Sequence, residues 1–152
     1  MRKQKERGTE LRKSFMVSKF LLDTNVFIAS VKRGWTDTTE LVFHVLSDDK
    51  YHVIGNNVLL AEYRKYAEKL NALDFYEFLR LRMEIVNPHR KEVLRVIPYF
   101  PPSQIADAVH AATCLKTGAV LITNDRHFEK VAEEGMIEVW SISEAIRKIL
   151  GR

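Results

Sequence analysis

Four acidic residues of the sequence occupy positions from which a divalent metal ion can be bound. Asp23 directly follows an apolar run, and Asp125 closely follows another. Glu62 lies at the edge of an apolar stripe with helical spacing, and Asp107 lies in a helical segment rich in alanine. A cluster of three or four carboxylates can hold one or two hard cations such as Mg²⁺ or Mn²⁺, which activate water and stabilise charge on phosphate. The chemistry that this set indicates is metal-dependent hydrolysis of phosphodiester bonds.

Each acid also has a purely structural explanation. Asp23 can form an Asx turn, and Asp125 can be the N-cap of a helix that follows it. Glu62 and Asp107 fall near the beginnings of helices, where the helix macrodipole favours a negative charge. The four acids indicate a site only as a set, because ligands of open α/β sheets gather beyond the carboxyl ends of the strands and all four acids are expected there.

Other polar residues near these acids are open to two interpretations. Asn25, Thr123 and Asn124 can hydrogen-bond a neighbouring carboxylate or water, and they can equally be ordinary turn residues. His110 follows Asp107 by three residues and can share its helix face. The alternative for His110 is a partly buried histidine whose hydrogen bonds are satisfied within the core.

The acids must be positioned by an alternation of apolar runs and helical segments. This alternation predicts an α/β fold in which helices cover a parallel sheet. Strands are expected at Lys19–Leu22, Tyr51–Ile54, Ala119–Thr123 and Ile137–Ile142, with a brief apolar pair at Ile85 and Val86. A polar turn through Asn25 is expected after the first strand. Helices are expected from about Thr36 to Ser47, Asn57 to Leu70, Asp74 to Met83, Pro88 to Pro98, Ser103 to Thr117, Arg126 to Glu134 and from Ser143 onward. Their expected caps are the Asp37–Glu40 capping box, Asn57, Ser103 and Ser143.

Length and composition fit one globular domain, since the chain has 152 residues of which 46% are hydrophobic. No apolar run approaches the roughly 18 residues that a membrane helix needs, and Met1 to Lys19 is too charged for a secretory signal. We therefore expect a cytoplasmic protein without membrane contact. Cys114 is the only cysteine, which excludes an intramolecular disulfide and a cysteine-based zinc cluster.

The basic character of the chain is confined to its first residues. The formal net charge is +4 and the pI is near 9.2. Within residues 1–15, Arg2, Lys3, Lys5, Arg7, Arg12 and Lys13 face only Glu6 and Glu10, so the remainder of the chain is formally neutral. This composition predicts a basic, disordered tail at 1–15 and a single domain at 16–152. Met16 stands just before the first strand and is an alternative start codon.

Four segments of the sequence together resemble the PIN domain family. They are FLLDTNVFI, LLAEY, ADAVHAA and VLITNDRHF, and they occur in that order within a span from about Phe20 to Ile146. The resemblance implies a three-layer α/β/α nuclease fold with a central, mostly parallel sheet. It also implies a catalytic site in which four acids bind Mg²⁺ or Mn²⁺, with lesser support from three polar residues. These residues are Asp23, Glu62, Asp107 and Asp125, supported by Asn25, Thr123 and Asn124.

Within that family the chain resembles the compact VapC-like toxin ribonucleases of toxin–antitoxin pairs. The resemblance implies an endoribonuclease that is a homodimer and is silenced by an antitoxin protein. The basic extension at 1–15 departs from the compact toxin pattern, which points either to Met16 as the start codon or to a role other than a toxin. The alternatives to a toxin are a housekeeping RNA-processing enzyme, a single-strand nuclease and a catalytically silent RNA-binding scaffold. An aspartyl phosphatase would need an acid where Asn25 stands, and a receiver domain would need an acid paired with Asp23.

Overall fold

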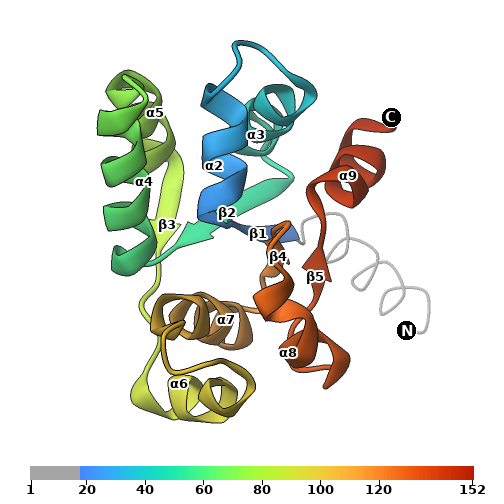
Figure 1. The fold of residues 1–152 in the computed structure, drawn as a ribbon. Coiled ribbons are helices and arrows are strands. Elements are labelled where there is room, and N and C mark those ends of the chain that lie inside the picture. Colours follow the sequence, from blue (N-terminus) through green and yellow to red (C-terminus); the bar gives the residue numbers. More distant parts are fainter. Residues whose placement is uncertain (1–17) are drawn as a thin grey trace, which may run out of the picture.

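The computed structural model describes residues 18–152, which contain a five-stranded sheet in the order β3-β2-β1-β4-β5 (Figure 1). The strands are β1 Ser18–Leu22, β2 Tyr51–Gly55, β3 Met83–Ile85, β4 Val120–Ile122 and β5 Val139–Trp140. Every neighbouring pair is parallel, which confirms the predicted sheet. The predicted tail at 1–15, and Met16, lie outside the described residues.

Helices cover both faces of this sheet. In Figure 1, α2 and α3 lie on one side of the strands, whereas α6 and α7 lie on the other, so the fold has the three layers α/β/α. The helical elements are α2 Thr24–Val31, α3 Asp37–Ser47, α4 Asn57–Lys69, α5 Leu73–Arg82, α6 Arg90–Val96, η1 Ile97–Tyr99, α7 Ile105–Thr117, η2 Arg126–Phe128, α8 Glu129–Glu133, α9 Ile142–Ala145 and η3 Ile146–Leu150. Among the described residues, none of these helices combines the length and the apolar character that crossing a membrane requires.

The strand order creates a switch point between β1 and β4. The chain proceeds from β1 outward to β2 and β3, and then returns to place β4 on the other side of β1. Leu22 at the end of β1 is the register partner of Ile122 at the end of β4. The loops after these two strands therefore leave the same edge of the sheet, where α/β folds usually bind ligands.

Core packing fixes α4 against the end of β1. Phe20, Leu21 and Leu22 are buried, as expected for a central strand covered on both faces. The fully buried ring of Tyr63 stacks on Phe27 with ring centroids 5.0 Å apart, and its hydroxyl donates to the Leu22 carbonyl. This contact holds the α4 segment that carries Glu62 close to the strand end.

The predicted polar turn through Asn25 is wrong, because α2 begins directly at Thr24. Asp23 has the extended backbone of an N-cap, with φ −62° and ψ 161°, and its Oδ1 accepts from the Thr24 N–H at 2.9 Å. Asn25 is consequently part of the first helical turn. Because the helix follows the strand without a loop, the side chains of Asp23 and Asn25 have little freedom of orientation.

Four predicted helix caps are also wrong. The capping box of α3 joins Thr36 and Thr39, and the caps of α4 and α9 are Asn56 and Ser141. Ser103 does not cap α7, which begins after Gln104 without a side-chain cap. Where several candidate caps stand close together, the cap is the residue whose backbone is extended, and long-range packing decides which residue that is.

The predicted strands at 119–123 and 137–142 are longer than the observed β4 and β5. Pairing between them is restricted to Leu121 with Val139 and Ile122 with Trp140. The predicted helix at 126–134 is divided into η2 and α8. Apolar character thus extends beyond the residues that form ladder hydrogen bonds.

Candidate active site

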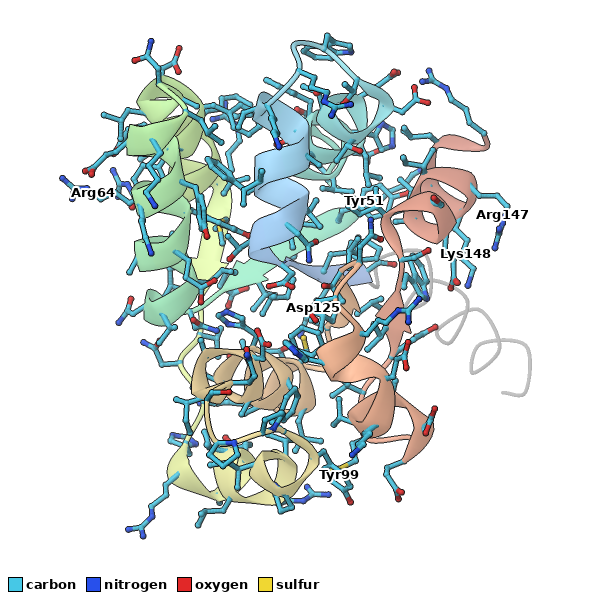
Figure 2. The ribbon with its side chains drawn as sticks, viewed as in Figure 1. Tyr51, Arg64, Tyr99, Asp125, Arg147 and Lys148 are labelled. Atoms are coloured by element: carbon cyan, nitrogen blue, oxygen red, sulfur yellow. The ribbon has the colours of Figure 1, made fainter. Side chains whose placement is uncertain are left out.

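The switch point brings together acids that are distant in the sequence. Asp23 follows β1, and Asp125 follows β4 after Thr123 and Asn124. The Asp23 N–H donates to the Ile122 carbonyl at 3.0 Å, which continues the β1–β4 ladder by one residue. Figure 2 shows Asp125 near the middle of the molecule, between α2 on one side and α7 on the other.

Asp23 is the most deeply buried of the four acids, with 4% of its surface exposed. Its Oδ2 accepts from the Thr123 hydroxyl at 2.7 Å and from the Asn25 amide at 3.3 Å. Burial raises the pKa of Asp23 above its usual 3.8, although the Thr123 hydrogen bond opposes this rise. A buried carboxylate in this state gains from a cation that replaces its lost hydration.

Glu62 lies on α4 and has a hydrogen-bond donor on each carboxylate oxygen. His110 Nε2 lies 3.0 Å from Oε1, and the Thr24 hydroxyl donates to Oε2. Burial alone would raise the pKa of Glu62, but the hydrogen bonds from His110 and Thr24 and nearby positive charges together outweigh it and hold the pKa below its usual 4.5. Glu62 is thus kept ionised and oriented.

Asp107 and Asp125 both contact the ring of His127. The Nδ1 atom of His127 lies 3.1 Å from Asp107 Oδ2 and 3.1 Å from Asp125 Oδ1. Asp125 also accepts from the His127 N–H at 2.9 Å, so the predicted capping role of Asp125 is confirmed for η2. His127 was not predicted as part of the site. Its only signal in the sequence is its position two residues after Asp125.

The four acids form two adjacent groups. The candidate ligand atoms of Asp23, Glu62 and His110 lie within 4.8 Å of one another, as do those of Asp107, Asp125 and His127. Burial raises the pKa of Asp107, and the charges of Asp23 and Asp125 raise it further, which links the groups electrostatically. Carboxylates that lie close together and are at least partly buried fit a hard divalent cation, because oxygen donors are the ligands that Mg²⁺ and Mn²⁺ prefer.

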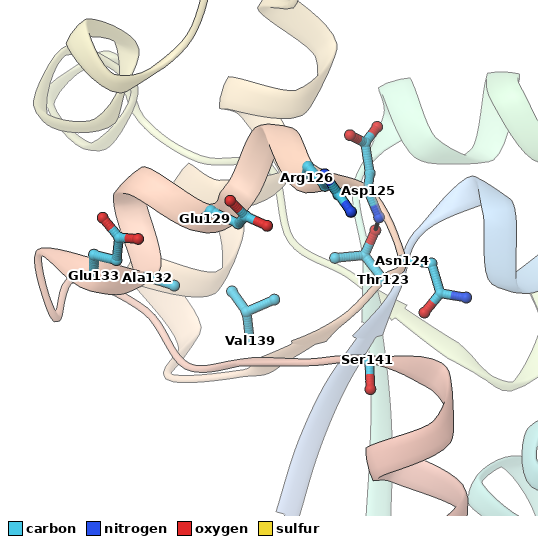
Figure 3. A pocket seen from close by; sticks show the side chains of 9 residues that line it. All are labelled: Thr123, Asn124, Asp125, Arg126, Glu129, Ala132, Glu133, Val139 and Ser141. Carbon is cyan, nitrogen blue, oxygen red and sulfur yellow. Dashed lines mark hydrogen bonds between the residues drawn. The ribbon is translucent and has the colours of Figure 1, made fainter.

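The predicted supporting residues divide into two kinds. Thr123 and Asn25 contact Asp23, and Asn25 also donates to the Thr123 hydroxyl at 3.1 Å. Asn124, in contrast, turns its Oδ1 to the Ile142 N–H at 3.0 Å, at the beginning of α9. Figure 3 shows the side chains of Asn124 and Asp125 pointing in different directions. The Asn124 N–H donates to Asn25 Oδ1 at 3.3 Å, so Asn124 contacts the residues around Asp23 through its backbone, whereas its side chain contacts the beginning of α9.

A pocket of about 440 Å³ adjoins the Asp125 side of the acid cluster. Its lining includes Asp125 and Arg126 after β4, and Glu129 and Glu133 on α8 (Figure 3). Asp23, Glu62 and Asp107 are not among its lining residues. The pocket therefore lies beside the acid cluster, and the acids other than Asp125 do not line it.

Comparison with known proteins yields one family match. The PIN domain family model matches residues 20–134. No curated protein matches the chain in sequence. Solved structures that share the fold include PAE2754 from Pyrobaculum aerophilum, with a TM-score of 0.59, 16% identity, and coverage of 90% of this chain and 100% of that one.

Two complexes share the fold to the same extent. VapBC-1 from nontypeable Haemophilus influenzae aligns with a TM-score of 0.60 and 20% identity over 82% of this chain and 98% of that one. DNA-bound VapBC from Salmonella typhimurium aligns with a TM-score of 0.59 and 22% identity over 83% of this chain and 99% of that one.

Proposed function

The chain belongs to the PIN domain family, and on this premise we propose that it is a metal-dependent endoribonuclease that hydrolyses RNA phosphodiester bonds. The observation that carries the proposal is the meeting of four carboxylates at the β1–β4 switch point, with two of them raised in pKa by burial. Such a site has a negative charge that a divalent cation neutralises. Phosphodiester hydrolysis is the reaction that this arrangement serves best.

The four acids have distinct tasks in this proposal. Asp23, Asp107 and Asp125 bind Mg²⁺ or Mn²⁺ directly or through water, whereas Glu62 binds the metal or orients the attacking water. The bound metal supplies an activated water and stabilises the charge on phosphorus and the leaving oxygen. Thr123 and Asn25 hold the Asp23 carboxylate in place by their hydrogen bonds.

His110 is not a metal ligand in this assignment, although it lies in the group with Asp23 and Glu62. Both of its ring nitrogens have partners in the protein, Asn56 at 3.0 Å and Glu62 at 3.0 Å. Ligation would require that one of these buried hydrogen bonds be broken. In the group of Asp23, Glu62 and His110, the protein ligands are therefore oxygen atoms, as Mg²⁺ prefers.

The first expected result concerns the substrate. Purified protein with Mg²⁺ should cut unstructured RNA internally, because a flexible strand can reach partly buried acids at the end of the sheet more easily than a rigid duplex can. The measurement is gel analysis of end-labelled unstructured RNA, structured RNA and single-stranded DNA. Equal cleavage of the DNA would identify a general single-strand nuclease, and intact RNA under all conditions would refute the proposal.

The toxin role and its partners belong to the same proposal. We propose that the protein is the toxin of a toxin–antitoxin pair, acts in the cytoplasm as a homodimer and is silenced by an antitoxin protein. The fold that it shares with the two VapBC complexes supports this role. The basic residues 1–15 favour the alternative of a housekeeping RNA-processing enzyme. Growth arrest on expression, together with a small copurifying partner, distinguishes the toxin from that alternative.

A second expected result concerns the basic residues 1–15. Ser18, the first residue that the structure describes, begins β1 at the end opposite Asp23, about 16 Å away at ~3.3 Å per residue, and all four acids lie within residues 23–125. Deletion of residues 1–15 should leave turnover at saturating RNA unchanged and weaken RNA affinity at low salt. The measurement is KM and kcat across a salt series, in which the salt dependence of binding should become less steep. Loss of kcat at saturating RNA would contradict this expectation.

A further inference from the structure

A chain of buried polar side chains runs behind the acid cluster from the beginning of α4 to Glu62. Asn56, His110 and Thr113 are fully buried, with 0% of their surfaces exposed. Asn56 contacts His110 Nδ1 at 3.0 Å and the Thr113 hydroxyl at 3.0 Å. Buried polar groups destabilise a core unless they are hydrogen-bonded, so a core position filled by histidine calls for an explanation.

The donor and the acceptor of each hydrogen bond in this series of side chains can be assigned. Asn56 Oδ1 accepts from the Leu59 N–H at 2.7 Å, and a backbone N–H can only donate, so the Asn56 amide group must face His110 with its NH₂. His110 Nδ1 is therefore an acceptor and its hydrogen is on Nε2. The Thr113 hydroxyl donates to the Val109 carbonyl at 2.8 Å, which leaves it free to accept from Asn56.

This series of hydrogen-bonded side chains ends at the Glu62 carboxylate. His110 Nε2–H donates to Oε1 at 3.0 Å, and the Thr24 hydroxyl approaches Oε2 from the opposite side. The side chain of Glu62 is 29% exposed, so it is the one member of the chain that reaches the solvent side of the cluster. Donors on both oxygens restrict rotation of the carboxylate and leave its other lone pairs available.

We propose that His110, with its tautomer set by Asn56, is a positioning residue that holds the Glu62 carboxylate in the orientation required for metal binding. This inference rests on the proposed function, since it concerns the metal site of the same nuclease. A hydrogen-bonded partner behind a ligating side chain fixes its orientation, and loss of such a partner typically weakens metal binding about 10–100-fold.

The test measures Mn²⁺ binding to the full-length, metal-free protein by calorimetry, without RNA. His110→Leu removes the donor at nearly constant volume and should weaken Mn²⁺ binding about 10–100-fold. His110→Gln, which can place an amide N–H near the Nε2 position, should restore most of the affinity. Thr113→Val is the matched control: it also removes a partner of Asn56 on the same helix, and it should leave Mn²⁺ affinity unchanged.

Two further variants distinguish a positioning role of His110 from general damage to the core. In a Glu62→Ala background, His110→Leu should cause no additional loss of Mn²⁺ affinity, because it acts through Glu62. Asn56→Ser keeps an oxygen for the cap of α4 and removes the amide donor, and it should weaken Mn²⁺ binding even if His110→Leu does not fold. In RNA cleavage, the loss should appear in kcat and not in KM.

The outcomes distinguish this inference from the proposed function. Wild-type protein that binds no Mn²⁺ would overturn both. Wild-type protein that binds Mn²⁺, with His110→Leu or Asn56→Ser binding it equally well, would overturn the role of His110 alone. An equal loss in Thr113→Val would likewise overturn it, because the effect would then be structural.

Discussion

Replacement of Asp23 by Asn should reduce RNA cleavage about 10³-fold, the scale of loss when one preorganised electrostatic group is removed from an active site. The substitution removes a charge and turns one carboxylate oxygen into an NH₂ group that cannot bind a cation. The fold should remain, because Asn is as good an N-cap as Asp and can still accept from the Thr24 N–H.

Stability provides an independent check on this substitution. Burial disfavours the charged form of Asp23, so the metal-free Asp23→Asn protein should be at least as stable as the wild type near neutral pH. Asp49→Asn is the matched control, because it makes the same chemical change at an exposed site and should leave cleavage unchanged. Unchanged cleavage in Asp23→Asn would refute the carboxylate mechanism.

Removal of divalent metal should abolish RNA cleavage and also destabilise the protein near neutral pH. A chelator should reduce cleavage to background, and Mg²⁺ or Mn²⁺ should restore it, because the acids alone cannot supply an activated water. A cation present at 100 times its Kd should raise the free energy of unfolding by about 2.7 kcal/mol, since it binds only the folded site. Chemical denaturation with chelator and with Mn²⁺ measures this gain.

The pH dependence of the metal-free protein follows from the same acids. Asp23 and Asp107 have folded pKa values above the unfolded value of 3.8, because burial favours the protonated forms. The folded state therefore binds more protons between the unfolded and folded pKa values, and the free energy of unfolding falls as the pH rises through that window. Glu62 has a lowered pKa, so its contribution has the opposite sign and is lost only below about its usual 4.5.

These signs predict that the contributions of Asp23 and Asp107 to the stability of the metal-free protein decline as the pH rises from about 3.8 through their folded pKa values. They also predict that Mn²⁺ adds more stability above this window than within it. The Asp23→Asn protein should show a shallower pH dependence and a smaller gain from Mn²⁺. Metal-free stability that increases steadily toward neutral pH would contradict the expectation. So would an equal gain from Mn²⁺ in the wild type and in Asp23→Asn.

Much of the fold follows from local patterns in the sequence. The apolar runs that end before Asp23 and Asp125 predict two buried parallel strands, and each strand is found within a few residues of its expected position. The cap positions were less predictable. Thr36, Asn56 and Ser141 each stand within two residues of the predicted cap, and their extended backbones depend on how each helix packs on the sheet.

The histidines show where the sequence is insufficient. His110 was expected to be either a satisfied core residue or a neighbour of the site, and the structure shows that it is both, because one ring joins Asn56 to Glu62. His127 carried no distinct signal, because its contact with Asp107 spans 20 residues and depends on the relative placement of α7 and η2. Neither contact has a periodicity that can be detected along the chain.

The sequence by itself determined the α/β class and the approximate positions of the strands that precede Asp23 and Asp125, because apolar periodicity and the alternation of elements are local properties of the chain. Only the tertiary structure decided that β4 lies beside β1, and thus that Thr123 reaches Asp23 across 100 residues. It also decided that the side chain of Asn124 turns away from the acids and that Glu62 has donors on both oxygens. Such contacts depend on side-chain direction and on packing between elements that are distant in sequence, and the order of residues records neither.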